Sequence, residues 1–328
     1  MSGAVQFYIS TLLVYLAVDV MACWALNLQF GVAGLMNFAF IIFQAAGAYT
    51  AAVLTLGSPD ASGNFQSYVF GSSMPFPLPL LAAAAVGAVL SLVVGLITLR
   101  RLRSDYQAMV MLVVSIIATT VVTNEIRLFN GPAGLSTIPQ PLADVLNLDP
   151  LDYQWFYVAM SVVICAVVYF FVHRITVSPL GRTLRAVRDN DAAAAALGKD
   201  VTRMRMFAFV VGGAIAAVSG AVLVQFIGAW APGGWLYPET FVLLGAVIIG
   251  GRGNQLGSIV GALLLPVGFA EATRFLPPIG RPGLIDALQW VAIGLLILLF
   301  LWFRPQGIFP ERRRTFDGSG TPNRAWTR

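Results

Sequence analysis

Residues 77–99 read PLPLLAAAAVGAVLSLVVGLITL, an apolar run without a charged side chain. A helix rises about 1.5 Å per residue, so about 20 apolar residues cross a hydrocarbon core of about 30 Å. In lipid every backbone N–H and C=O must be bonded within the protein, which leaves helices or closed barrels. Because the run does not alternate between apolar and polar residues, it predicts a membrane-spanning helix.

Composition extends this prediction to the whole chain. Of 328 residues, 58% are hydrophobic and 11% are charged, against about 25% charged in an ordinary soluble domain. We predict an all-α, polytopic membrane helix bundle with about nine spans, in a range of about eight to ten. The predicted spans are 7–28, 34–56, 77–99, 106–124, 154–172, 206–228, 239–250, 255–276 and 284–303.

Two of these spans are candidates for broken or re-entrant segments. Gly31, Gly34 and Gly47 are expected to interrupt the second, and the seventh is short for a full crossing. Irregular backbone is tolerated at membrane depth where it lines a cavity enclosed by protein.

Basic residues predict the orientation. They gather at 100–103, at 174–205 and at 304–328, which nine spans place on one side, whereas Arg127, Arg274 and Arg281 lie on the other. Since cytoplasmic loops are enriched in Lys and Arg, the C-terminus is expected inside. Residues 1–304 then form the transmembrane domain, with a cytoplasmic loop at 175–205, and residues 305–328 form a cytoplasmic tail. The net charge of +5 follows from this topology, and no basic stripe interleaved with aromatic residues indicates nucleic-acid binding.

The chain carries no recognisable catalytic, metal-binding or nucleotide-binding motif. His173 is the sole histidine, and HExxH, CxxC and GxSxG are absent. Gly198-Lys199 is followed by Asp200, and Ala193 stands where a phosphate loop needs its first glycine. We therefore predict no enzyme and no cofactor bound by this chain. Cys23 and Cys165 lie inside spans and are expected to be small buried residues.

Small residues recur every four positions in three segments, a spacing that lets helix backbones approach closely. Such grooves indicate a tight bundle, a partner subunit, or both. The residues are Gly87, Ser91 and Gly95; Gly212, Ala216 and Gly220; and Gly253, Gly257 and Gly261.

Polar residues within spans are costly in lipid and are candidates for function. They are Asp19, Asn37, Gln44, Asn124, Gln225 and Glu271. Glu271 and Arg274 are three apart on one helix face and are expected to form an ion pair. Asp19 lies deeper, where it faces a solute path, pairs with a neighbouring helix, or lies nearer an interface.

The loop 175–205 reads ITVSPLGRTLRAVRDNDAAAAALGKDVTRMR. Leu180, Leu184 and Val187 recur at the spacing of a short amphipathic helix. Asp189 or Asn190 can cap a second helix, which Gly198 ends. Two interpretations remain: a helix on an anionic membrane surface, or a helix pair whose knobs and charges dock into a partner protein.

Residues 178–209, SPLGRTLRAVRDNDAAAAALGKDVTRMRMFAF, resemble the coupling loop of the LivM-type permeases of bacterial branched-chain amino acid ABC importers. The resemblance extends over nearly the whole chain. It includes Gly34-Leu35 with Gly47-Ala48-Tyr49, the segment 130–135, Gly250-Gly251 followed by Gly257 and Gly261-Ala262, and the ending Arg304-Pro305-Gln306-Gly307.

This resemblance implies a multi-pass permease of the bacterial inner membrane that pairs with a homologous LivH-type permease. It further implies two cytoplasmic ATPase subunits, which handle ATP and Mg, and a periplasmic solute-binding protein. The residues implied in coupling to the ATPase are Pro179, Leu180, Gly181, Leu184, Arg185, Val187, Arg188, Asp189, Asn190, Leu197 and Gly198. Those expected along the substrate pathway are Asp19, Asn37, Phe40, Phe43 and Asn124.

The chain departs from the family pattern in the second and fourth spans. Asn37, Ala39 and Phe40 stand where the family commonly has Ser, then Gly, then His or Gln, and Ile116 replaces an expected carboxylate. These changes make the pathway wall less polar. Urea, short amides and small aromatic solutes therefore stay open beside branched-chain amino acids. An ion-gradient-driven secondary transporter using Asp19 and Glu271 is the alternative mechanism.

Overall fold

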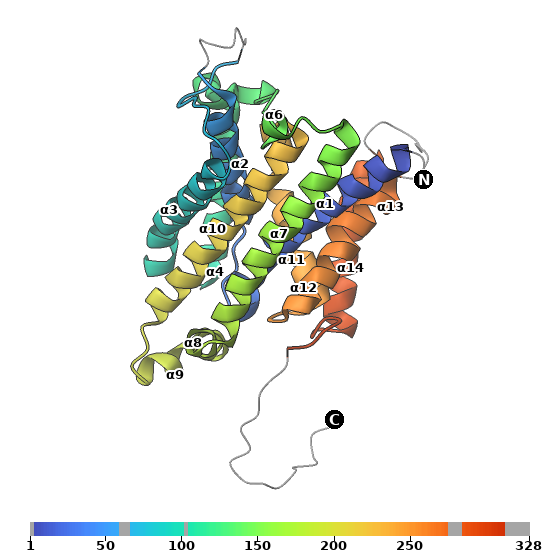
Figure 1. Ribbon diagram of the computed structural model, residues 1–328. Coiled ribbons are helices and arrows are strands. Elements are labelled where there is room, and N and C mark those ends of the chain that lie inside the picture. The colour runs from blue at the N-terminus through green and yellow to red at the C-terminus, as the bar shows by residue number, and fades with distance from the viewer. Residues whose placement is uncertain (1–2, 59–65, 102–103, 275–283, 312–328) are drawn as a thin grey trace.

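The computed structural model describes residues 3–58, 66–101, 104–274 and 284–311. Their regular structure is helical, apart from two isolated bridges that join Tyr68 to Phe129 and Leu135 to Trp230. The long helices run side by side as a bundle, and α8 and α9 lie at one end of it (Figure 1). The helices of five or more residues are α1 (Gly3–Leu26), η1 (Asn27–Val32), α2 (Phe40–Leu56), α3 (Leu78–Arg101), α4 (Ser104–Asn124), α7 (Pro150–Val177), α8 (Pro179–Asp189), α9 (Asp191–Ala196), α10 (Val201–Ile227), α11 (Tyr237–Gly250), α12 (Gln255–Ala262), η4 (Leu263–Phe269), α13 (Ala270–Arg274) and α14 (Leu284–Phe303).

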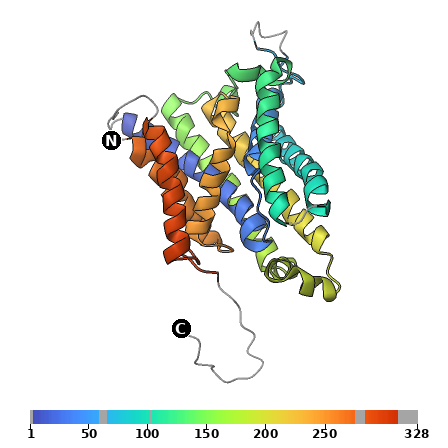
Figure 2. The ribbon, with the colours of Figure 1, turned by 180° about the vertical axis from the view of Figure 1, so that it is seen from behind.

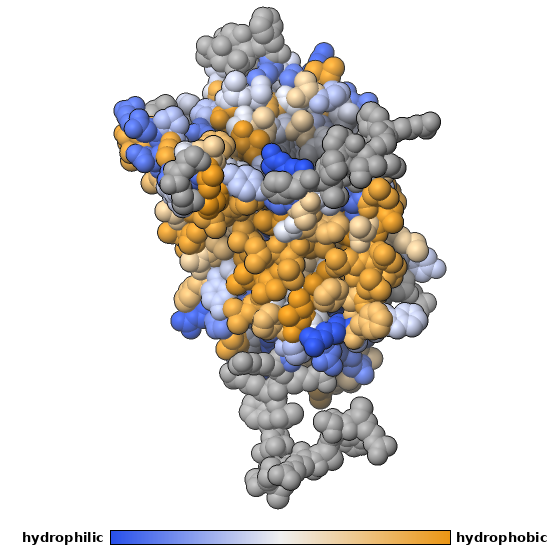
Figure 3. All heavy atoms as spheres, turned by 90° about the vertical axis from the view of Figure 1, so that its right-hand side faces the viewer, coloured by the Kyte–Doolittle hydropathy of each residue, from blue (hydrophilic) through white to orange (hydrophobic). Residues whose placement is uncertain are grey.

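Seven helical segments among the described residues are long and apolar enough to cross a membrane, and two shorter apolar helices, 40–56 and 287–303, accompany them. On the face drawn in Figure 3, apolar side chains form a broad band across the middle, and hydrophilic side chains gather toward the two ends. The polytopic helical bundle is thus confirmed. The count of nine crossings and the side on which the C-terminus lies stay predictions.

The break in the backbone lies before the second span rather than inside it. The chain leaves α1 through the π-helical η1 and an irregular stretch, and α2 begins at Phe40 instead of residue 34. Gly47 was predicted wrongly as an interruption: α2 is continuous through it. An added Cβ there would collide with the backbone of Ala217 in α10, so this glycine serves close packing.

The seventh span is longer than predicted, because its apolar helical segment begins at Pro232 and ends at Gly250. The eighth contains an irregularity that the sequence analysis missed. Pro266 lies inside the π-helical η4, where it cannot donate a backbone hydrogen bond.

The centre of the bundle is α10, which packs against α1, α2 and α3. In Figure 1 α10 runs lengthwise beside α3, and Figure 2 shows α4 and α14 on the opposite side of the bundle. By contrast α3, α4 and α7 expose many apolar side chains, including Ile97, Ile117 and Val163. This outer surface suits lipid or a second membrane subunit.

Candidate functional site

The loop predicted to couple folds as two short helices, as expected. The Ser178 hydroxyl oxygen accepts a hydrogen bond from the Gly181 N–H (3.4 Å), and Pro179 is the first residue of α8. The Asn190 side chain accepts from the Ala193 N–H (2.9 Å) and caps α9, and Gly198 follows α9 at φ +77°. Asn190, not Asp189, is therefore the cap, and the Ser178 cap was missed although Ser-Pro is a common helix start.

The apolar stripe of α8 faces the protein's own bundle. Leu184 and Val187 are buried and Leu180 is partly buried against the main core. A Cβ on Gly181 would collide with the carbonyl oxygens of Ile175 and Thr176. Leu184 and Val187 are thus not knobs presented to a partner, because their own chain already covers them.

The outward surface is formed by the other residues of this helix pair. We define it as the outer face of α8–α9, consisting of Pro179, Arg182, Ala186, Asp189, Asn190, Ala192, Ala193, Ala195, Ala196, Leu197, Gly198 and Lys199, all exposed. Leu197 is 81% exposed. A small apolar surface of alanines with one protruding leucine can receive a partner protein.

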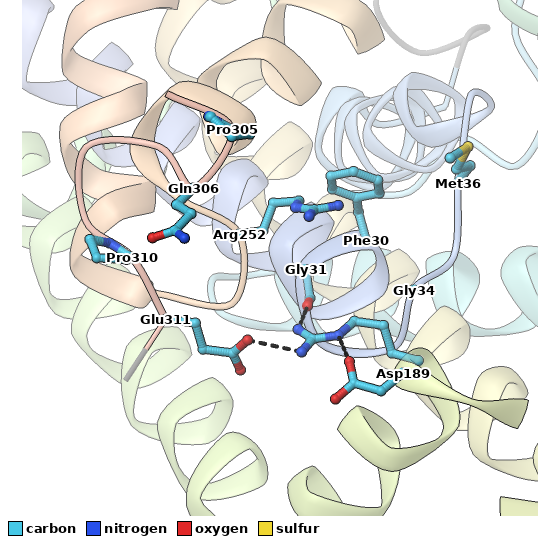
Figure 4. Close-up of a pocket in the computed structure, with 11 residues that line it drawn as sticks. Phe30, Gly31, Gly34, Met36, Asp189, Arg252, Pro305, Gln306, Pro310 and Glu311 are labelled. Atoms are coloured by element: carbon cyan, nitrogen blue, oxygen red, sulfur yellow. Dashed lines mark hydrogen bonds and ion pairs between the residues drawn. The ribbon is translucent and has the colours of Figure 1, made fainter. Parts of the chain in front are cut away.

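The arginines on the inner side of α8 contact a residue far along the chain. Arg185 Nε lies 2.6 Å from Glu311 Oε1, a close ion pair without hydrogen-bond alignment. Arg188 Nη2 lies 2.9 Å from Glu311 Oε2, and Arg188 Nε lies 3.0 Å from Asp189 Oδ1. Arg188 Nη1 also donates to the Gly31 carbonyl of η1 (Figure 4).

Burial of the Arg188 guanidinium lowers its pKa, but hydrogen bonds and charge attraction from Glu311 and Asp189 outweigh that effect and raise the pKa above its usual value. Arg188 is therefore a permanent cation with its partners inside this chain. Neither this cluster nor Glu311 was found from the sequence, because no local pattern pairs residue 311 with 185 and 188.

A cavity of about 780 Å³ lies beside this cluster, between η1, the α11–α12 turn and the residues after α14. Phe30, Arg188, Arg252 and Glu311 line it, and Arg252 lies over the Phe30 ring at 5.7 Å (Figure 4). The cavity therefore has apolar, cationic and anionic walls.

The predicted pathway residues are not brought together at one site. Asn37, Phe40 and Phe43 are buried beside the break, where Asn37 Nδ2 donates to Gln29 Oε1 (2.9 Å) and Phe43 meets Phe209 edge to face. Asp19 is half-buried on α1. Asn124 is exposed at the end of α4, where its Nδ2 donates a hydrogen bond to the Thr120 carbonyl of the same helix (2.8 Å). Their place along a solute path stays a prediction.

Gln29 is a buried polar residue that the sequence analysis missed. Its Nε2 donates to the Phe209 carbonyl of α10 (2.9 Å) while its Oε1 accepts from Asn37. It could have been found as one more polar residue near the end of the first span.

The three small-residue motifs all serve packing inside the chain. Gly87, Ser91 and Gly95 of α3 face α10, Gly212 faces Gln29, and Gly220 faces Gln44. Ala216 is buried with them. Gly257 and Gly261 of α12 meet the α11 backbone, and Gly253 faces the Glu311 carboxylate. The sequence analysis expected these motifs to pack helices within the chain, to contact a partner subunit, or both. Within this chain, they pack helices against one another.

The predicted ion pair between Glu271 and Arg274 is confirmed. Arg274 Nη1 lies 3.6 Å from Glu271 Oε1, and both cysteines are free thiols, Cys23 buried and Cys165 partly buried. His173 is exposed, stacks on Tyr169 and contacts Gln255 (3.1 Å). Within the described ranges, no group of three or more His, Cys, Asp or Glu residues could hold a metal ion.

A bundle of long apolar helices, with a pair of short surface helices at one end, defines a multi-pass helical membrane protein. Residues 8–303 match the family described as "branched-chain amino acid transport system / permease component". The chain belongs to this family, and it is a multi-pass protein of the bacterial inner membrane.

Individual relatives agree. The chain is 29% identical over 311 residues to the high-affinity branched-chain amino acid transport system permease protein LivM of Salmonella typhimurium, covering 88% of this chain and 67% of the relative. It is 26% identical over 335 residues to the probable LivM of Methanocaldococcus jannaschii, covering 93% and 94%. The permease LivH of Salmonella typhimurium is 32% identical over 155 residues, 45% of this chain and 47% of LivH. No solved structure matches the fold.

Proposed function

We propose that this chain forms, with a homologous LivH-type permease, the membrane pathway of an ABC importer for branched-chain amino acids or a similar small solute. Two cytoplasmic ATPase subunits drive it, bind ATP and Mg, and leave this chain without catalysis or cofactor. A periplasmic binding protein delivers the solute. The observation that supports the proposal is the helix pair α8–α9, which has an exposed outer face in a chain of this permease family.

The outer face of α8–α9 is the surface that the ATPase contacts. It projects from the end of the bundle and combines exposed alanines with Leu197, which is 81% exposed. Surface helices on lipid need a broad apolar face turned toward the bilayer. Here the apolar stripe of α8 is buried in the bundle, so lipid is not its partner.

The experiment measures ATPase binding and ATP-driven uptake by the purified importer in proteoliposomes, with Leu197→Asp as the test variant. Leu197 makes no buried contact that the bundle depends on, so assembly of the permease pair should persist. ATPase binding should fall by about tenfold or more, since a charge enters an apolar contact. Arg274→Gln, at the other end of the bundle, is the control. Normal ATPase binding by Leu197→Asp would reject this docking surface.

The solute class is decided by the binding protein and the pathway wall together. Phe40 and Phe43 are both buried in the main apolar core beside the break, so a pathway wall that includes them is apolar there. Branched-chain side chains suit such a wall, as do small aromatic solutes. Competition of unlabelled leucine, urea, acetamide and benzoate against uptake separates these alternatives.

A further inference from the structure

The residues after α14 form a strap that is built into the same end of the bundle as α8 and α9. The C-terminal strap, residues 304–311, follows the last helix and pairs with the end of α11. The Ile308 N–H donates to the Ile249 carbonyl (2.8 Å) and the Phe309 N–H to the Gly250 carbonyl (2.9 Å). Helix C-termini leave such carbonyls without helical partners, so the strap satisfies them.

Glycines fix the path of the strap. Gly307 has φ +74° and lies against Gly251, whose own φ is +120°. A Cβ on Gly251 would collide with the Phe309 carbonyl, and a Cβ on Gly253 would lie 2.8 Å from the Glu311 carboxyl carbon. Asn254 Nδ2 also donates to the Pro310 carbonyl (3.3 Å). The path of the strap therefore holds the Glu311 side chain beside Gly253, in the turn between α11 and α12.

At that place Glu311 receives both inner arginines of α8. Its two carboxylate oxygens pair with Arg185 (2.6 Å) and Arg188 (2.9 Å), and its side chain is only 17% exposed. Pairs this close and partly desolvated are worth more than exposed surface pairs.

Arg188 continues the connection into the break after α1. Its Nη1 donates to the Gly31 carbonyl, and Gly34, at φ +73°, lies so close that a Cβ there would be 2.7 Å from Arg188 Cγ. Asn27 joins the same break to the α11–α12 turn, because its Oδ1 accepts from the Gly253 N–H (2.8 Å). Within the break, Gln29 Oε1 accepts from Asn37 and Gln29 Nε2 donates to the Phe209 carbonyl of α10.

We propose that Glu311 is a positioning residue for the transport reaction: it clamps α8 against the strap so that movement of α8 reaches the break at residues 27–39. The inference rests on the proposed function, since it requires an ATPase that moves α8. Without the Glu311 carboxylate, Arg188 and Arg185 lose the fixed point that ties α8 to the bundle. When the ATPase moves α8, the helix then shifts alone and residues 27–39 do not move with it.

The test is the number of solute molecules carried per ATP hydrolysed by the complete importer in proteoliposomes. Glu311→Gln removes the charge and keeps the shape. We expect ATP hydrolysis to stay within about twofold of wild type while the transport ratio falls about fivefold or more, the size of a typical energetic link between two sites. Arg274→Gln, which breaks an exposed ion pair at the other end of the bundle, should leave the ratio unchanged.

Two further measurements separate a positioning role from simple stabilisation. Because Glu311 acts through both arginines, adding Glu311→Gln to the double variant Arg185→Gln/Arg188→Gln should lower the ratio no further than that double variant alone. Hydrogen exchange in Glu311→Gln should rise at residues 27–36 and 179–189 but not at 206–227.

A wild-type transport ratio with wild-type exchange in Glu311→Gln would overturn the inference alone. Equal losses of hydrolysis and uptake, together with a lowered unfolding temperature, would also overturn it, because they would show that Glu311 only stabilises the fold. If the wild-type complex takes up solute without ATP, the proposed function itself fails, and the inference fails with it.

Discussion

Leu184 and Ala186 lie two residues apart on α8, and the fold gives them opposite surroundings. Leu184 is fully buried against the bundle, whereas Ala186 is exposed on the outer face. A side chain of the first kind contributes to the stability of the permease itself. One of the second kind is free to contact another protein.

Substituting aspartate at each position should therefore have different effects. Removing the buried Leu184 side chain costs about 2–5 kcal/mol, and an unpaired carboxylate in its place adds a desolvation penalty. We expect Leu184→Asp to lower the unfolding temperature in detergent and to loosen α8. Ala186→Asp should leave unfolding within about 0.5 kcal/mol and weaken ATPase binding. The reverse pattern, a stable Leu184→Asp and an unstable Ala186→Asp, would contradict the placement of α8.

The sequence predicted the apolar stripe of α8 but not its partner. Leu180, Leu184 and Val187 have helical spacing, which indicates burial without saying whether the cover is the same chain or another protein. Arg188 illustrates the same limit. Its charge suggested contact with an ATPase, yet its partners are Gly31, Asp189 and Glu311. Contacts between residues so far apart in the chain have no local signature.

The crossing of α2 and α10 depends on small residues from both helices. Gly47 faces the Ala217 backbone, and Gly220 faces the Gln44 carbonyl. With no side chain between them, the helices approach closely, and packing of this kind replaces the hydrophobic effect in lipid.

Enlarging one of these glycines should separate the two helices. In Gly220→Leu the new side chain meets the Gln44 backbone, which cannot move aside, so we expect little folded protein. Gly294→Ala in α14 is the matched control, because nothing lies within 4 Å of a Cβ there. That change should be neutral or stabilising by up to about 1 kcal/mol. Fluorescence size-exclusion chromatography measures both, and a monodisperse Gly220→Leu at wild-type yield would refute the crossing.

At the level of elements, the sequence predicted most spans and missed how two of them bend. Apolar length alone locates α3, α4, α7 and α10. The start of α2 at Phe40 depends on η1 and its tertiary contacts, since Gln29 and Asn37 bond one another and α10. The π-helix around Pro266 likewise needs knowledge of its neighbours.

As a whole, one chain uses its three small-residue motifs for its own packing and leaves apolar surface on α3, α4 and α7. We therefore expect a second permease to bind that outer surface. Co-expressed with a tagged LivH-type permease, this chain should co-purify at equal stoichiometry and, alone, hydrolyse no ATP. Val89 on α3 is 61% exposed, and we expect Val89→Arg to reduce co-purification with the second permease. Trp302→Arg on α14, outside this surface, is the control and should co-purify as the wild type does. ATP turnover by the isolated chain, free of contaminating ATPase, would contradict the expectation.

The energy source is the property of the whole molecule that separates an ABC permease from a secondary transporter. A secondary transporter would need intramembrane carboxylates that bind and release the coupling ion. Of the two candidates, Glu271 already accepts a hydrogen bond from Tyr8 (2.7 Å) and pairs with Arg274. That leaves Asp19, half-buried on α1.

We expect Asp19→Asn, which keeps the size of the side chain and removes its charge, to retain ATP-dependent uptake. In proteoliposomes, an ionophore that collapses ion gradients should not inhibit either protein. An inactivating change in the partner ATPase should abolish uptake by both. Uptake that continues with the inactive ATPase, stops with the ionophore and is lost in Asp19→Asn would instead establish gradient-driven transport through Asp19.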